Sequence, residues 1–258
     1  MSTTPQHTYR HCIFLGQPGA GMSTAAHTLC KKIGMTYLSV SQLLEMVIEG
    51  DSQTAATVRS HLNSSKIITD QLFVQSIVEV IKSGKCRNGF ILDGLPKNIS
   101  QAKLLDEMLQ NTNIRIDAVF NFRVSDEQLL INRMRNSLIH QTSGRIYDLS
   151  RKSPKHAGKD DETGQELCHR YTLQNTEKRL CLYKLFSEPL LKHYAHKLIQ
   201  VDADKPITHV CKILLQYLPK PRPWYSPFGL LDTKTNWIRI MLAMLSIVTY
   251  IFINRTLL

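Results

Sequence analysis

Short apolar runs alternate along the chain with longer segments that have the hydrophobic spacing of helices. The runs, which are rich in β-branched or aromatic residues, are 12–15, 89–93, 118–124 and 197–203. Helical patterns between them are clearest at 24–33, 70–82 and 99–109. Apolar strands that alternate with helices are typical of a parallel sheet covered on both faces. We therefore predict an α/β fold.

Two segments depart from this alternation. Residues 139–169 are polar and rich in turn formers, which indicates an excursion from the core. Residues 219–227 hold four of the ten prolines, so we expect the folded domain, a monomeric unit of residues 1–218, to end near Leu218.

Residues 237–253 are strongly apolar, and 240–253 carry no charge. The apolar side chains occur all round the predicted helix, which favours a membrane anchor over a core or amphipathic helix. The stretch is shorter than the ~20 residues that cross a bilayer comfortably, so Arg239 is expected to reach the headgroups. We predict a linker at 219–236 and a tail anchor at 237–253 that holds the domain in the cytosol. The basic flanks favour the mitochondrial outer membrane, and the ER remains the alternative.

Charge and cysteine content narrow the function classes. The formal net charge of +11 suits polyanionic ligands, but no aromatic residues interleave with basic ones, which argues against nucleic acid. The six cysteines include no CxxC pair, so free thiols in a reducing compartment are expected. Only about ten residues precede the first strand, too few for a signal or transit peptide.

A glycine-rich loop, "GQPGAGMST" (16–24), lies between the first expected strand and the first expected helix. Backbone N–H groups can converge on a phosphate where glycine leaves room, and the helix N-terminus adds its dipole. The spacing matches GxxxxGK[ST], except that Met22 stands at the position of the lysine. A tight turn without a ligand is the alternative, but the position between strand and helix favours a phosphate loop.

Further segments resemble signatures of one family. They are "LSVSQLLE" (38–45), "KIITDQL" (66–72), "CRNGFILDGLPKNISQA" (86–102), "LIHQTSGRIY" (138–147) and "GKDDETGQEL" (158–167). Together with the glycine loop they resemble the adenylate kinase family with a long lid, in order over residues 11–218. The resemblance implies a P-loop NMP-kinase fold with a five-stranded parallel sheet, an NMP-binding insert near 39–68 and a lid near 137–172. It also implies transfer of a phosphoryl group from MgATP to AMP, forming two ADP.

The resemblance assigns roles to individual positions. The nucleotide-binding positions are Gly16, Pro18, Gly19, Ala20, Gly21, Met22, Ser23, Thr24, Gly94, Gln101 and Arg133. The catalytic positions are Asp93, Lys97, Arg170 and Arg179. Asp93 would orient water bound to Mg²⁺, Gln101 would read the AMP base, and Arg133 would lie against the adenine of ATP.

Several positions depart from the family pattern. Ser137 replaces a catalytic arginine, Glu45 reverses the charge of an AMP-phosphate ligand, and Gln42 replaces an aspartate on the metal side. Thr172 and Leu173 replace an acidic pair, and Val40 replaces a threonine that touches the AMP base.

Each lost transition-state donor typically costs ~10²–10³ in rate. We therefore predict a membrane-anchored nucleotide-binding protein, sensor or scaffold, with lost or strongly impaired catalysis. The alternative is a functional nucleoside monophosphate kinase in which Arg135 or Lys66 substitutes for a missing cation.

The expected lid contains His140, His156, Cys168 and His169. Zinc sites in such lids need paired CxxC-type ligands, which this sequence lacks, so we expect solvated side chains here. The acidic run 160–162 is expected to form a lid turn instead of a metal site.

Overall fold

The computed structural model describes residues 9–64, 66–140, 145–150 and 153–219. Most of the predicted linker and all of the predicted anchor at 237–253 lie outside these residues. Within the described ranges, no helix has the length and apolarity needed to span a membrane. The anchor therefore stays a prediction.

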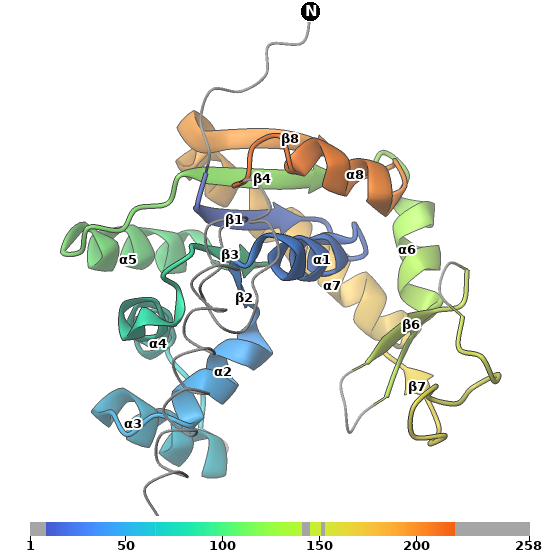
Figure 1. Ribbon diagram of the computed structural model, residues 1–258, viewed down its shortest axis with the longest axis horizontal. Coiled ribbons are helices and arrows are strands. Elements are labelled where there is room, and N and C mark those ends of the chain that lie inside the picture. The colour runs from blue at the N-terminus through green and yellow to red at the C-terminus, as the bar shows by residue number, and fades with distance from the viewer. Residues whose placement is uncertain (1–8, 65, 141–144, 151–152, 220–258) are drawn as a thin grey trace, which may run out of the picture. The chain divides into compact units, whose positions relative to one another are not determined.

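A five-stranded parallel sheet forms the centre of the domain (Figure 1). Its spatial order is β2 (Thr36–Leu38), β3 (Phe90–Asp93), β1 (His11–Gly16), β4 (Ala118–Arg123) and β8 (Leu198–Asp202). This confirms the predicted α/β fold. β2 escaped the sequence analysis because its three residues are too few to show a strand pattern. In the register, Phe14 of β1 pairs with Asp93, and Gly16 pairs with Phe122 of β4, so the carboxyl ends of three strands meet at one edge.

Helices cover both faces of this sheet because successive strand residues point to opposite sides. Ile13 and Leu15 enter one core cluster, and Cys12 and Phe14 enter the other. The first face is covered by α4 (Asp70–Val80), α5 (Ile99–Gln110) and α7 (Leu173–His193), and the second by α1 (Met22–Ile33) and α8 (Ile207–Leu214). Burying a side chain such as that of Phe14 contributes roughly 1.5–3 kcal/mol to the stability of the fold. The two clusters therefore hold the sheet, and with it the carboxyl ends of its strands, in place.

Two insertions depart from the sheet. The predicted NMP-binding insert holds α2 (Val40–Ile48) and α3 (Gln53–Asn63), capped by the hydroxyls of Ser39 and Ser52. The predicted lid holds an antiparallel sheet of β5 (Ser137–Ile139), β6 (Ile146–Asp148) and β7 (Cys168–His169). α6 (Glu127–Arg135) leads into this sheet and α7 leads back (Figure 1). The short helices η1 (Ile81–Lys85) and η2 (Ala195–Lys197) precede β3 and β8.

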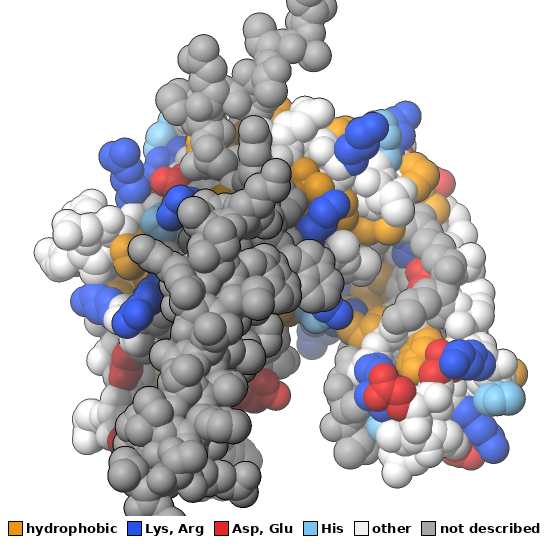
Figure 2. Space-filling view, viewed as in Figure 1, with side chains coloured by type: hydrophobic (Ala, Val, Ile, Leu, Met, Phe, Trp, Pro, Cys, Tyr) orange, Lys and Arg blue, Asp and Glu red, His pale blue; other side chains and the backbone are white. Residues whose placement is uncertain are grey.

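The Lys and Arg side chains that can be seen in Figure 2 do not gather in one patch. Lys and Arg side chains there lie over several elements, and acidic side chains accompany them around the lid sheet.

Candidate nucleotide site

The glycine loop joins β1 to α1 in a conformation that side chains would obstruct. A Cβ on Gly16 would lie 2.5 Å from the Phe122 carbonyl oxygen, and one on Gly19 would lie 3.0 Å from that of Leu130. Gly19 and Gly21 also have positive φ angles of 85° and 89°. The loop therefore requires glycine at these positions to pass closely under β4 and α6.

The loop ends at a helix N-terminus without a side-chain cap. Gly21 is the N-cap of α1 in left-handed conformation, and no side chain of the described residues bonds to this end. The first bond of α1 runs from the Ala25 N–H to the Gly21 carbonyl at 3.0 Å. The preceding amides, of Met22, Ser23 and Thr24, are thus left for an anion, as at phosphate-binding helix ends. The Ala20 N–H, by contrast, already donates to the Gln17 carbonyl at 3.0 Å.

Met22 has an apolar environment. Its half-buried side chain packs against the core cluster on the α1 face of the sheet. Position 22 therefore contributes packing to the start of α1 and supplies no charge to a bound phosphate.

Asp93 lies at the end of β3, next to the loop, and only 8% of it is exposed. Its Oδ2 accepts a hydrogen bond of 2.6 Å from the Tyr37 hydroxyl of β2. Burial, followed by the Asp93 carboxylate, raises the pKa of Tyr37, so the hydroxyl keeps its proton at neutral pH. Tyr37 was missed by the sequence analysis, which predicted no strand between the helical pattern at 24–33 and the segment 38–45.

Two acceptor groups that the family resemblance places on the metal side have the chemistry to accept hydrogen bonds from waters on a Mg²⁺ ion. Gln42 Oε1 is buried and has no hydrogen-bond partner among the described residues, and Asp93 contributes the carboxylate. Both accept hydrogen bonds, which metal-bound waters donate. The set fits Mg²⁺ with one negative charge. When bound, Mg²⁺ would neutralise charge on the nucleotide phosphates.

Gln101 is held by partners of its own. It is 7% exposed, its Nε2 donates to Asp70 Oδ1 at 2.8 Å, and its Oε1 accepts from the Lys97 N–H at 2.8 Å. One amide proton and one lone pair remain for a nucleotide base. The Lys97 side chain itself is exposed, and Gly94, with a positive φ of 65°, follows Asp93 directly.

Arg133 bonds to a loop that the sequence analysis did not assign to the site. Its Nη1 donates to the Ala203 carbonyl at 3.0 Å, just after β8. Ile207, at the start of α8, lies 3.7 Å from where a Cβ of Gly21 would be. The segment 203–207 thus adjoins both Arg133 and the glycine loop. The sequence did offer a signal for this segment, because it follows the expected strand 197–203 directly, and ligands of α/β sheets bind at the carboxyl ends of strands.

Arg170 and Arg179 share one aromatic ring. The guanidinium carbons lie 5.1 Å and 5.0 Å from the centre of the Tyr171 ring. Cation–π attraction therefore holds the two cations together without the acidic pair that the family pattern places nearby. Ser137 is buried in β5, where its carbonyl accepts from the Arg170 N–H at 2.9 Å, while Glu45 is exposed on α2.

Two hollows lie at the carboxyl ends of β4 and β8, with volumes of about 300 and 540 Å³. Gln17 of the glycine loop, Arg123 and Gln200 line both of them. Arg123 is therefore a further cation beside the loop, and it too was missed from the sequence.

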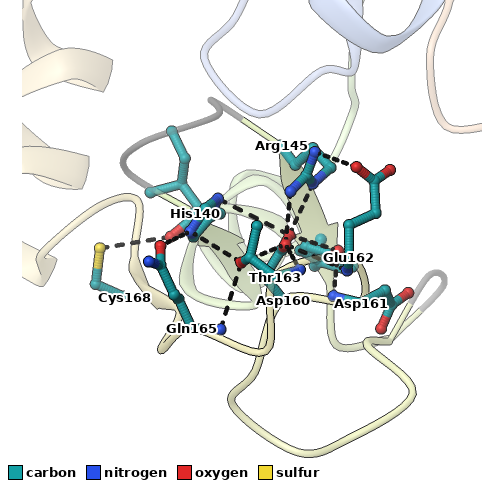
Figure 3. A network of polar contacts seen from close by, with 10 residues as sticks. His140, Arg145, Asp160, Asp161, Glu162, Thr163, Gln165 and Cys168 are labelled. Atoms are coloured by element: carbon teal, nitrogen blue, oxygen red, sulfur yellow. Dashed lines mark hydrogen bonds and ion pairs between the residues drawn. The ribbon is translucent and has the colours of Figure 1, made fainter.

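The lid sheet is organised around a buried carboxylate (Figure 3). Asp160 accepts from Arg145 Nε at 2.8 Å and Nη2 at 2.6 Å, from the Tyr147 hydroxyl at 2.9 Å, and from Thr163. The Arg145 hydrogen bond is the first cause that holds the pKa of Asp160 well below its usual range. The predicted turn at 160–162 is present, with Asp160 as its buried anchor.

The prediction of solvated lid side chains is wrong for His140. It is 2% exposed, and its Nε2 lies 2.7 Å from Gln165 Oε1. Cys168 is half-buried, whereas His156 and His169 are exposed. Among the described residues, no three His, Cys, Asp or Glu side chains are grouped as metal ligands.

A parallel sheet whose first strand ends in a glycine loop and an uncapped helix defines a P-loop nucleotide-binding protein. The family model for adenylate kinase matches residues 14–199. An adenylate kinase of Sodalis glossinidius (strain morsitans) is 35% identical over 184 residues, which cover 70% of this chain and 84% of that protein. The chain belongs to the adenylate kinase family and is an adenylate-kinase-like nucleotide-binding protein. These matches give no support to the expected loss of catalysis and agree better with the alternative of a functional kinase.

Proposed function

We propose that the protein transfers a phosphoryl group from MgATP to AMP, forming two ADP, and that it does so slowly. The observation that carries this proposal is the meeting of the uncapped α1 N-terminus with the buried Asp93 at one edge of the sheet. The relative from Sodalis glossinidius, named an adenylate kinase, supports the same reaction.

The side chains at this edge divide the work. The first-turn amides of α1 bind ATP phosphates, and the Asp93 carboxylate would accept hydrogen bonds from waters of a bound Mg²⁺ ion, which would supply positive charge beside the phosphates. Arg170 and Arg179 stabilise negative charge on the transferred phosphoryl group. Gln101 uses its remaining amide proton and lone pair to hydrogen-bond the AMP base. Phosphoryl transfer depends mainly on such positioning and electrostatic stabilisation, so a partial set of cations still lowers the barrier.

We expect phosphoryl transfer to be slower than in a kinase with the full family pattern, because two cationic side chains that would stabilise the transition state are absent. Met22 is packed against the core, and Ser137 is buried in β5, so neither can contact the phosphoryl group with a charge. At ~10²–10³ per donor, the combined loss is roughly 10⁴–10⁶ if the effects are independent and smaller if they are not. Kinases of this type turn over at ~1–100 s⁻¹, so a slow but measurable reaction is expected.

A second candidate is a nucleotide-binding sensor or scaffold without phosphoryl transfer. The specific observation in its favour is the apolar packing of Met22 at the position from which a lysine would reach the phosphates. Binding through backbone amides does not need that lysine.

The test is ADP formation by the purified full-length chain from MgATP with and without AMP. We expect AMP-dependent ADP that disappears in Asp93→Ala and persists in Glu107→Ala, a matched exposed carboxylate on α5. ATP binding without AMP-dependent ADP would instead support the sensor or scaffold.

A further inference from the structure

Three side chains join the start of α4 to the start of α5. Asp70, in the first turn of α4, accepts hydrogen bonds from Gln101 Nε2 at 2.8 Å and from Asn98 Nδ2 at 3.2 Å. Asn98 is the N-cap of α5, and its Oδ1 accepts from the Gln101 backbone N–H at 2.8 Å. The side chain of Gln101 is therefore held by groups on two helices, in a place where only 7% of the residue is exposed.

These contacts allow one orientation of the Gln101 amide. An ionised carboxylate only accepts hydrogen bonds, and a backbone N–H only donates them. Nε2 must therefore face Asp70, and Oε1 must face the Lys97 N–H, which lies 2.8 Å away. Rotating the amide by 180° would set oxygen against carboxylate and NH₂ against N–H, so two hydrogen bonds would become repulsive contacts. Asn98 cannot relieve this conflict, because the Gln101 backbone N–H fixes its orientation as well.

An amide fixed in this way distinguishes purine bases by the substituent on carbon 6. Adenine has an amino donor there beside the acceptor N1, whereas a 6-oxopurine has an oxygen acceptor beside an N1–H donor. After its contacts with Asp70 and Lys97, the Gln101 amide keeps one N–H and one lone pair. These two positions match the pattern of adenine, and a 6-oxopurine bound in the same place would need the rotated amide.

We propose that Asp70 is a specificity-determining positioning residue, which locks the Gln101 amide so that the nucleoside monophosphate site accepts adenine and rejects 6-oxopurines. The inference rests on the contact between Gln101 and the AMP base proposed above. It adds the group that selects the base, since Asp70 acts through Gln101 and not through a contact of its own with the nucleotide.

The experiment measures the dissociation constants of AMP and of inosine monophosphate by isothermal titration calorimetry with the full-length chain. Inosine monophosphate differs from AMP only in the oxygen on carbon 6 and the proton on N1, so the comparison isolates the orientation of the amide. Wild type is expected to bind AMP at least about 30-fold more tightly, because the rotated amide loses a hydrogen bond to a charged group, and such a bond corresponds to about 10- to 150-fold in affinity.

Asp70→Asn tests the lock with almost no change of shape. The new amide can donate toward Gln101 Oε1, so the rotated orientation gains a partner and the preference for AMP should fall by at least about tenfold. Asp51→Asn, the same substitution at an exposed position of the NMP-binding insert, should keep the wild-type preference. The melting temperature of each variant checks that the contact between the two helices is intact.

A purely structural role of Asp70 would weaken the binding of both nucleotides by the same factor, and an unchanged ratio would overturn the inference. Equal affinities of wild type for AMP and inosine monophosphate would also overturn it, while AMP-dependent ADP formation would still support the proposed function. Absence of binding by either nucleotide would overturn the proposed function and this inference with it.

Discussion

Replacing Tyr171 by leucine should weaken nucleotide binding without unfolding the protein. The ring is half-buried and contacts Arg170 and Arg179 at 5.1 and 5.0 Å. Each cation–π contact at an exposed site contributes ~0.5–1 kcal/mol, so both together hold the guanidinium pair in place by about 1–2 kcal/mol. At 1.4 kcal/mol per tenfold, ATP affinity should fall by about 5- to 30-fold.

The control is Tyr171→Phe, which keeps the ring face. Calorimetric titration with ATP should place this variant within about twofold of wild type, because the phenyl face still attracts both cations. The melting temperature of each variant checks that the fold is intact. If the leucine and phenylalanine variants bind ATP equally well, the shared ring does not organise the two arginines for nucleotide binding.

Three further predictions follow from the loop, the lid and the tail. Met22→Lys should raise the rate of ADP formation by at least tenfold, and up to the ~10²–10³ typical of one donor, in a steady-state assay; an unchanged rate would mean that position 22 does not face the phosphates. Asp160, with its lowered pKa, stabilises the lid at every pH above its usual value of 3.8 and loses this contribution only as the pH falls toward the native value. Hydrogen exchange of the lid should therefore show constant protection from about pH 5 to 7, and reduced protection throughout that range in Asp160→Asn. Residues 219–258 fused to a fluorescent protein should localise to membranes, and a soluble fusion would refute the anchor.

The hydrophobic pattern predicted four of the five strands because each is a short run rich in apolar residues between helical segments. β2 has three residues, and its pairing with β3 depends on the register of strands far apart in the sequence. The Tyr37–Asp93 hydrogen bond follows from that register, so no local signal could have shown it.

The lid shows a different limit of sequence reasoning. Polar residues in an insertion suggest solvent exposure, yet His140 and Asp160 are buried. In the small antiparallel sheet, the Asp160 carboxylate accepts several hydrogen bonds. Polar groups can be buried when their hydrogen bonds are made in this way. Residues carried over by resemblance, such as Arg133, lie beside the loop, but their partner at Ala203 came only from the structure.

The glycine loop at this sheet edge is proposed to bind adenine nucleotides. The most direct test of this binding is a titration of isotopically labelled full-length protein with ATP, followed by amide chemical shifts in NMR spectra. We expect the largest changes at the amides of Gly21, Met22, Ser23 and Thr24, with further changes at Arg133 and 203–207. Saturable shifts confined to other elements, or no shifts at all, would contradict it.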